Sequence, residues 1–212
     1  SPGLTRVAVP AGSFAEWLRA LPLRSAGSKV HLFDGRERPS QAPVRAVVDI
    51  DVGSHDLQQC ADAIIRLRAE YLWAQGWADR VAFRFTDGTR ARWFDWREGW
   101  RPVEAGGHIS WHHPAAPDSS YSSFREYLNS VFTYAGSRSL ERQLSPVADP
   151  RQVEPGDVFV HGGSPGHAVL VVDVACDARG RRMFLLAQSY MPAQDIHVLR
   201  NPARADDAWY PA

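Results

Sequence analysis

The chain has 212 residues, of which 44% are hydrophobic, 11% aromatic and 23% charged. This composition is typical of a folded globular protein with one core, and it excludes a disordered, fibrous or coiled-coil chain. Lys and Arg together number 24, as do Asp and Glu. The positive and negative charges balance, so the protein has no net positive charge that would attract a polyanion. Nucleic acid is therefore not an expected partner. We expect a monomer with a single domain over residues 1–212.

No apolar run approaches the roughly 18 residues that span a bilayer, so no integral membrane segment is expected. The sequence begins Ser1-Pro2-Gly3 without Met, which is compatible with removal of an upstream segment. Its two cysteines, Cys60 and Cys176, match neither a zinc spacing nor a disulfide framework. The sequence therefore predicts no metal and no cofactor.

The N-terminal part, about residues 1–75, is predicted to be mainly helical. Its strongest pattern, over 57–73, carries apolar residues at helical spacing behind an N-cap signal. Four elements are expected in chain order: a helix over 14–21, a loop with at most one edge strand over 24–43, a strand over 44–52 and a helix over 57–73.

The remainder, about residues 81–200, is predicted to be rich in strands. A hairpin is expected over 81–94, irregular or short-stranded chain over 93–111, a helix over 124–134, a connector over 146–155, and strands over 157–161, 167–176, 182–188 and 196–199. This order predicts an α+β protein in which helices pack on a mainly antiparallel C-terminal sheet.

Cys60 is the first candidate for chemistry, because it falls in the first turn of the strongest predicted helix, after a strand. The unpaired N–H groups and the dipole of a helix N-terminus stabilise a thiolate, which is the nucleophilic form of cysteine. Cys60 also shares an apolar stripe with Ile64, Leu67 and Tyr71. The alternative is therefore a buried cysteine that packs as a small hydrophobe.

His167 is the second candidate, because a glycine-rich loop over 162–166 delivers it to the start of an apolar strand. A strand start holds the ring on a rigid backbone, which suits a general base. The glycines leave room for a substrate backbone, and Ser164 among them is a candidate substrate contact. The alternative is a histidine with a structural role at the strand end.

Gln188 is the third candidate and lies at the end of the next predicted strand. With a four-residue hairpin loop, Cys176 pairs with Arg181 and Val169 pairs with Gln188. Gln188 is then a diagonal neighbour of His167 on one face of the sheet, where it can orient the imidazole. The alternative is a glutamine that caps the sheet edge in water.

Together these stretches resemble the papain-like cysteine peptidase superfamily, in which a cysteine begins a helix, a histidine opens a strand and an Asn follows on the next. His167-Ala168-Val169 and Gln188-Ser189-Tyr190 match its His and Asn-Ser-Trp neighbourhoods, with Gln188 in place of Asn. The chain from Phe124 onward is also similar to NlpC-type cell-wall peptidases of the same superfamily. The resemblance covers about the last 90 residues and the Cys60 helix, and it implies a papain-like fold.

The sequence departs from these families in two places. NlpC-type enzymes carry the nucleophile at the start of the helix that matches 124–134, where this chain has serines at 119–123 and no cysteine. Papain-like enzymes place an oxyanion-stabilising Gln several residues before the Cys, whereas Gln59 directly precedes Cys60. The nucleophile is therefore either Cys60 or one of these serines.

The chain also resembles a bacterial family of unknown function whose members are exported and often lipid-anchored. These proteins carry stretches similar to DLQQCADA, GGSPGHA and AQSYMPAQ. The resemblance implies export to the periplasm or cell surface, with a lipid anchor in the full-length precursor. It implies no activity by itself.

An aromatic stretch over 93–111 contains four tryptophans, and the last of them, Trp111, is flanked by His108, His112 and His113. The tryptophans could form a floor that stacks on sugar rings or peptide side chains, although large aromatics more commonly pack in a core. The histidines lie in a stretch rich in Gly and Pro, so they do not predict a zinc site. The candidate substrate contacts are Trp93, Trp96, Trp100, Ser164 and Tyr190.

The sequence thus predicts a thiol-dependent amide hydrolase, either a peptidase or an amidase. Cys60 would be the nucleophile, His167 the base and acid, and Gln188 the orienting residue. The backbone N–H of Cys60 together with Gln59 would hold the oxyanion. By analogy the substrate is the peptide of bacterial peptidoglycan. The alternative is an inactive papain-like protein that binds cell-wall glycan or peptide through the tryptophans.

The same assignment predicts two unbridged thiols. His167 and Cys176 are the two ends of one predicted strand, roughly 30 Å apart at about 3.3 Å per residue. Bridged cysteines need α-carbons within about 7 Å. If Cys60 meets His167, it cannot also be bonded to Cys176.

Overall fold

A computed structural model describes residues 3–204 and 207–212. The chain forms two compact units, each assembled from segments that are far apart in the sequence. The sheet unit comprises Ser1–Ile64, Ser145–Phe159 and Ala168–Ala212, and the aromatic unit comprises Ile65–Leu144 and Val160–His167. The expected organisation as one domain over 1–212 stays a prediction.

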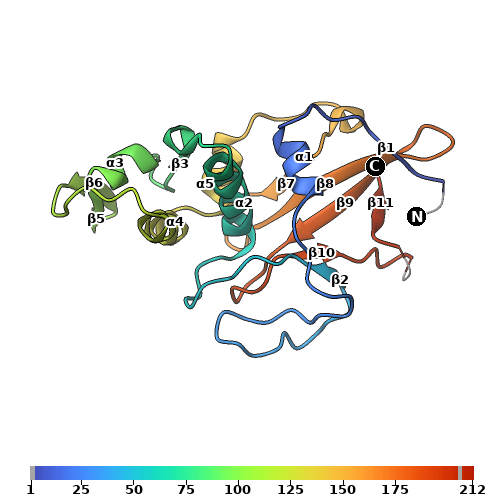
Figure 1. Cartoon of the computed structure of the whole chain (residues 1–212), viewed down its shortest axis with the longest axis horizontal. Helices are drawn as coiled ribbons and strands as arrows, with labels where there is room; N and C mark the ends of the chain where they lie inside the picture. Colours follow the sequence, from blue (N-terminus) through green and yellow to red (C-terminus); the bar gives the residue numbers. More distant parts are fainter. Residues whose placement is uncertain (1–2, 205–206) are drawn as a thin grey trace. The chain divides into compact units, whose positions relative to one another are not determined.

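A seven-stranded sheet is the centre of the sheet unit (Figure 1). Its strands are β1 (Thr5–Arg6), β2 (Val44–Val47), β7 (Val158–His161), β8 (His167–Cys176), β9 (Arg182–Gln188), β10 (His197–Leu199) and β11 (Trp209–Pro211). The order is β1-β8-β9-β10-β2, with β7 on β8 and β11 on β9. The pairs β1–β8, β8–β9, β9–β10, β9–β11 and β10–β2 are antiparallel.

The mixture of helices with an antiparallel sheet confirms the α+β class. The two strands expected over 167–176 and 182–188 are confirmed as β8 and β9. The sheet is not purely C-terminal, however, because β1 and β2 come from the first 50 residues. The strand expected over 44–52 is confirmed as the shorter β2. β1 has only two residues, and its partners lie more than 100 residues away, so local sequence patterns carry little information about it.

The β8–β9 hairpin has a register that differs from the expected one at its turn. Cys176 lies opposite Arg182 rather than Arg181, because the turn is one residue longer than expected. A bulge at Val172 then shifts the register back by one residue, so that Leu170 lies opposite Ala187. One further step in this register places Val169 opposite Gln188, as the sequence predicts.

Buried ion pairs hold the N-terminal segment on β8. The carboxylate of Asp173 lies 2.8 Å from Arg6 Nε of β1 and accepts a 2.7 Å hydrogen bond from Arg19 Nε. Arg19 ends α1 (Phe14–Arg19), a helix that the sequence predicts and that Ser13 caps by accepting from the Glu16 N–H. Since Asp173 is buried, these two arginines supply the partners that an interior carboxylate needs.

The remaining elements of the sheet unit are helical. The short 3-10 helix η2 (Pro150–Gln152) lies in the segment expected to be a connector. Helix α2 (Cys60–Ala74) begins in this unit, three residues later than the expected start at 57. No helix in the described ranges is long and apolar enough to cross a membrane.

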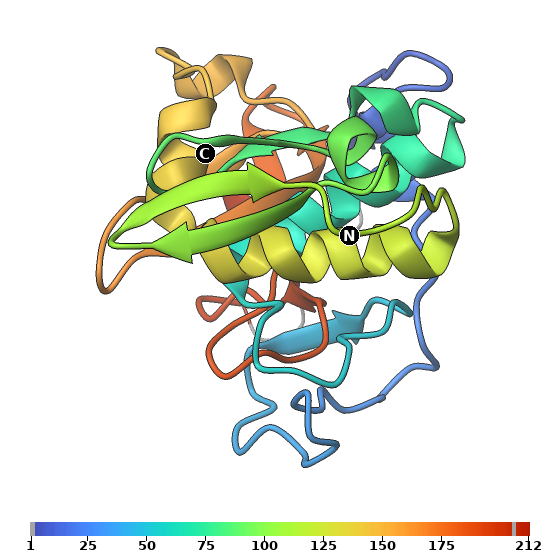
Figure 2. The same cartoon turned by 90° about the vertical axis from the view of Figure 1, so that its left-hand side faces the viewer.

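The aromatic unit consists of short helices and two hairpins (Figure 2). Its elements after α2 are η1 (Ala78–Arg80), β3 (Ala82–Arg84), β4 (Arg90–Arg92), α3 (Trp93–Arg97), β5 (Arg101–Ala105), β6 (His108–His112), α4 (Tyr121–Tyr134) and α5 (Ser137–Gln143). The expected hairpin over 81–94 is confirmed as β3–β4, and the helix over 124–134 as the longer α4. In the stretch 93–111 the short strands that the sequence allows are present as the β5–β6 hairpin, whereas helix α3 is not expected from the sequence.

The core of this unit is a cluster of aromatic rings. Trp73 stacks on Phe124 with 4.5 Å between ring centroids, and Trp93 meets the edge of Phe124 at 5.2 Å. Tyr127 contacts Trp93 at 5.8 Å and donates its hydroxyl proton to the carbonyl of Ala91. Burial raises the pKa of Tyr127, so this hydroxyl stays a donor at any physiological pH.

Candidate functional site

The side chain of Asp62 caps the N-terminus of helix α2. The carbonyl of Gln59 accepts the first helical hydrogen bond, from Ala63 N–H at 2.9 Å, which makes Gln59 the N-cap residue. Asp62 Oδ2 in turn accepts from the Gln59 N–H at 3.1 Å, as the third helical residue of a capping box does. Cys60 is therefore the first residue of α2, and it is half-buried.

Asp62 has an unusual environment for a carboxyl group. It is only 6% exposed, and its Oδ1 has no hydrogen-bond partner within the described part of the chain. Burial raises the pKa of Asp62 well above its ordinary value, and the proximity of Cys60 raises it further. A protonated Asp62 carries no charge, so it does not repel a thiolate at Cys60.

Two sequence motifs, residues 56–62 and 188–197, meet in the sheet unit, and we call them the paired motifs. The buried Ser189 hydroxyl lies 3.0 Å from the Gln58 carbonyl and 2.8 Å from the Gln194 carbonyl, either of which can accept its proton. The Asp56 carboxylate accepts from the Ala193 N–H at 2.6 Å. These contacts fix the turn before Cys60 against the loop after β9.

Gln188 lies directly opposite His197 on the neighbouring strand β10. Gln188 is 8% exposed, and His197 is fully buried. The His197 Nδ1 is 3.0 Å from the carbonyl of Asp195, which fits an Nδ1–H donor in a neutral ring. Burial lowers the pKa of His197, so the ring is neutral at pH 7.

Asp195 anchors the loop that carries these residues. Its carboxylate accepts two hydrogen bonds from Arg24, at 2.8 and 3.0 Å, and a third from the His31 N–H at 2.8 Å. The hydrogen bonds that Arg24 donates to Asp195 raise the pKa of Arg24. A bidentate pair of this kind sets both distance and orientation, so it holds the strand that presents His197.

Gln59, the expected oxyanion residue, donates one hydrogen bond from its backbone and one from its side chain. Its backbone N–H donates to Asp62, and its side-chain Nε2 donates to Asp56 Oδ1 at 3.1 Å. The amide nitrogen carries two hydrogens, so one remains for a substrate oxygen. Tyr190, an expected substrate contact, lies directly after the buried Ser189 and is 45% exposed.

His167 and Ser164 belong to the aromatic unit, where His167 is half-buried and Ser164 is exposed. Helix α5, which the sequence analysis missed, holds the glycine-rich loop. Gly162 N–H donates to Glu141 Oε1 at 2.9 Å, and a Cβ at Gly166 would lie 2.1 Å from the Ser137 hydroxyl. Gly162 and Gly166 are therefore needed for this close packing with α5.

Two of the three candidate tryptophans belong to the aromatic core. Trp93 and Trp96 are buried, and Trp96 donates its Nε1–H to Ser123 at 3.2 Å. Their burial favours the core-packing alternative over an aromatic floor. Trp100 is 40% exposed and tilts against His113, so it stays a candidate contact.

The chemistry of the remaining groups is simple. Cys60 and Cys176 are not bridged in the described structure, in agreement with the predicted pair of thiols. Within residues 3–204 and 207–212, no three His, Cys, Asp or Glu side chains gather as metal ligands.

The serines at 119–123 lie at the start of α4, where Ser120 caps the helix by accepting from the Ser123 N–H. This contact gives Ser120 a structural role.

Sequence reasoning missed Asp62, Ser189, Asp195 and His197. Ser189 and Asp195 bind residues more than 100 positions away, which no local pattern reveals. His197 had one usable signal, because it falls in a short apolar strand where a polar residue needs an explanation.

The protein has an α+β fold with an antiparallel sheet. At one end of this sheet a buried polar network lies beside helix α2, which begins with Cys60. The chain belongs to the DUF4846 family, described as "Domain of unknown function (4846)", which matches residues 1–212. No curated protein and no solved structure matches the chain.

Proposed function

We propose that the protein is a papain-like thiol hydrolase that cleaves an amide bond. Cys60 is the nucleophile, His167 the general base and acid, and Gln188 the residue that orients the imidazole. The backbone N–H of Cys60 and the side chain of Gln59 hold the oxyanion. The paired motifs position Cys60, Gln59 and Gln188, and β8 begins with His167.

The proposed reaction has two steps. The Cys60 thiolate attacks the carbonyl carbon, and His167 gives its proton to the leaving amine as the C–N bond breaks. The acyl group is then held as a thioester. His167 takes a proton from water as the water oxygen attacks the thioester, the C–S bond breaks, and the acid is released together with the Cys60 thiolate, which leaves His167 protonated as at the start.

The observation that carries this proposal is the position of Cys60 as the first residue of a 15-residue helix. The helix dipole and the N–H groups of its first turn favour a thiolate there. The buried Asp62 supports the assignment, because burial raises its pKa and so disfavours a negative charge beside that thiolate. The hydrogen bond between Ser189 and Gln58 supports it further, since it holds the turn that aims Cys60.

The proposed substrate is the peptide of bacterial peptidoglycan, and the proposed location is the periplasm or the cell surface. Both rest on resemblance to cell-wall peptidases and exported proteins. The exposed Tyr190, next to buried Ser189, and the exposed Ser164 are the proposed substrate contacts.

Selective alkylation of the intact protein tests the proposal without knowledge of the substrate. A thiolate reacts with iodoacetamide at mildly acidic pH, where an ordinary thiol does not. We expect Cys60 to be modified at least about tenfold faster than Cys176 near pH 6. Peptide mass spectrometry measures both rates in one sample, so Cys176 is the internal control.

Substitution of His167 separates the enzyme from a binding protein. His167→Ala should slow alkylation of Cys60 and leave the rate at Cys176 unchanged, because it removes the cation proposed to pair with the thiolate. Cys60→Ser should abolish release of amines from peptidoglycan fragments while the protein stays folded. If Cys60 is no more reactive than Cys176 and is indifferent to His167→Ala, the hydrolase is rejected in favour of the binding protein.

A further inference from the structure

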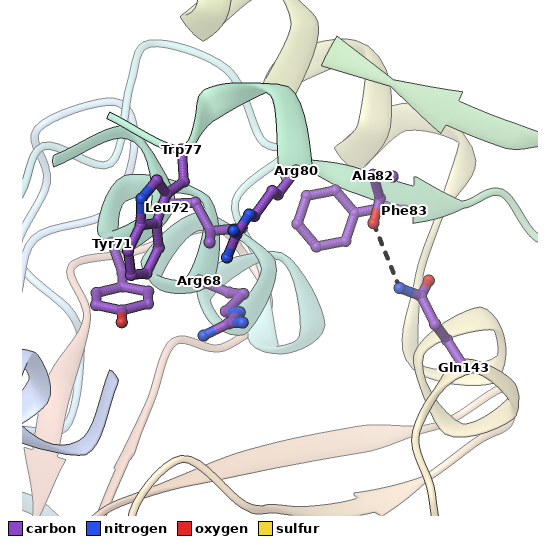
Figure 3. A pocket seen from close by; sticks show the side chains of 8 residues that line it. All are labelled: Arg68, Tyr71, Leu72, Trp77, Arg80, Ala82, Phe83 and Gln143. Atoms are coloured by element: carbon purple, nitrogen blue, oxygen red, sulfur yellow. Dashed lines mark hydrogen bonds between the residues drawn. The ribbon is translucent and has the colours of Figure 1, made fainter. Parts of the chain in front are cut away.

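An open cavity of about 300 Å³ lies in the aromatic unit, on residues that the proposed hydrolase does not use (Figure 3). Helix α2, η1, β3 and α5 contribute its walls. Its lining residues are Arg68, Tyr71, Leu72, Trp77, Arg80, Ala82, Phe83 and Gln143. The volume is at the lower end of the range of small-molecule sites, about 300–1,000 Å³.

Two arginines supply the polar chemistry of this cavity. Figure 3 shows both guanidinium groups between the Tyr71–Trp77 pair and Phe83. The Arg80 guanidinium lies over the Trp77 ring, 4.7 Å from its centroid, and Arg68 lies 5.2 Å from the centroid of Tyr71. Stacking on an aromatic face orients a guanidinium while its N–H groups at the edge can still donate.

The charge of the cavity is positive. None of its eight lining residues is acidic. The carboxylates nearby in sequence have other partners: Asp79 pairs with Arg97, and Glu70 binds Arg66 and the Tyr121 hydroxyl. In the described part of the chain no carboxylate forms an ion pair with Arg80. Partial burial lowers the pKa of Arg68.

The walls of the cavity are partly apolar, and packing and hydrogen bonds hold them in place. Leu72 and Phe83 are buried beneath it, and Tyr71 meets Trp77 edge to face at 6.1 Å. Gln143 is held to β3 at both ends of its amide, since it accepts from Arg84 N–H at 2.9 Å and lies 3.5 Å from the Ala82 carbonyl. The half-exposed Trp77 offers apolar surface for a ring next to the two guanidinium groups.

We propose that this cavity binds a small oxyanion, a phosphate or a carboxylate carried on a planar ring. The anion lies against the guanidinium edges of Arg68 and Arg80, which present paired N–H donors that match either group. The ring packs against Trp77. This site is independent of the thiol chemistry proposed for Cys60, because no residue is shared.

Calorimetric titration of the intact protein with phenyl phosphate, benzoate, inorganic phosphate and phenol tests the site. We expect at least one of the two aromatic anions to bind about tenfold more tightly than phenol, since only an anion can accept from the arginines. Tighter binding of phenyl phosphate assigns the site to phosphates, and tighter binding of benzoate assigns it to carboxylates. Failure of both to bind, or equal binding of phenol, overturns the proposal.

Variants link the binding to this cavity. Arg80→Gln should weaken the preferred anion about tenfold, whereas Trp77→Ala should weaken aromatic anions more than inorganic phosphate. Arg97→Gln is the matched control, because Arg97 stacks over Phe94 at the same 4.7 Å but pairs with Asp79 and lies outside the cavity. Equal loss of binding in Arg80→Gln and Arg97→Gln would show a diffuse charge effect and overturn the site. Arg80 is exposed, so its variant is expected to fold.

Discussion

The sheet unit and the aromatic unit bury their interiors with different chemistry. The sheet unit encloses charged and polar groups such as Asp173, Asp195 and His197, and each has at least one directional partner. The aromatic unit encloses mainly rings, around Trp93, and its buried Arg66 pairs with Glu70. Directional networks fix atoms in position, whereas ring packing contributes mainly stability. The polar network is therefore where reactive groups can be held precisely.

The largest expected effect is in the aromatic core. Trp93→Ala removes a buried indole that contacts Phe124 and Tyr127, so we expect a loss of roughly 3–5 kcal/mol in the free energy of unfolding. Chemical denaturation measures this loss. Trp100→Ala, at a residue that is 40% exposed, is the control and should cost under about 1 kcal/mol. Equal effects would show that Trp93 does not lie in a core.

A smaller loss is expected when the polar network is broken at its anchor. Asp195→Ala leaves Arg24 without its bidentate partner, and we expect a cost of about 2–4 kcal/mol because Asp195 is buried and Arg24 is only partly exposed. Asp49→Ala removes the second carboxylate near Arg24, which is exposed and 3.3 Å away. That control should cost between about 0 and 1 kcal/mol, as exposed ion pairs do.

Ser189→Ala tests whether the paired motifs depend on one hydroxyl. Loss of its contacts to Gln58 and Gln194 leaves buried carbonyls less well satisfied and should cost about 1–2 kcal/mol. Alkylation of Cys60 should slow as well, because the turn before Cys60 loosens. Ser164→Ala, at an exposed loop residue, should change neither stability nor that rate. A normal alkylation rate in Ser189→Ala would contradict a positioning role for the hydroxyl.

The smallest effect, and the only gain, is expected at Asp62. Its pKa is raised in the folded state, so its contribution to stability is present below the unfolded value near 3.8 and is lost as pH rises through the folded pKa. Asp62→Asn should therefore raise the melting temperature at pH 7 by a few degrees, corresponding to about 1 kcal/mol. The difference from wild type should shrink toward pH 4. A constant difference would show that ionisation of Asp62 is not its cause.

The regular elements with strong local patterns could be predicted from the sequence. The strands β8 and β9 follow from apolar runs that flank turn residues, and α1 follows from helical spacing that stops at Pro22. The strands β1 and β11 are two and three residues long and exist only because longer strands pair with them. Helix α5 was missed because a glycine such as Gly136 commonly ends a helix, whereas in this chain it is the N-cap from which α5 begins.

The candidate site could be predicted only in part. A cysteine near a helix start is visible in the sequence, but the side chain that determines the start is Asp62, inside the helix. The contact between Ser189 and Gln58 joins residues 131 positions apart, so it depends on the tertiary fold. Burial, which separates Trp93 from Trp100, is likewise a property of the folded chain.

The bulge at Val172 divides the β8–β9 hairpin into two parts, and the alignment of the two strands can change in one part without changing in the other. Between Cys176 and Asp173 the strands follow one alignment, and from Val171 onward they follow another, offset by one residue. A single-residue insertion or deletion in the turn can therefore be absorbed at the bulge, before it changes which side chains face Gln188. Loop length at the turn can drift during evolution while the opposite end of the hairpin keeps its alignment.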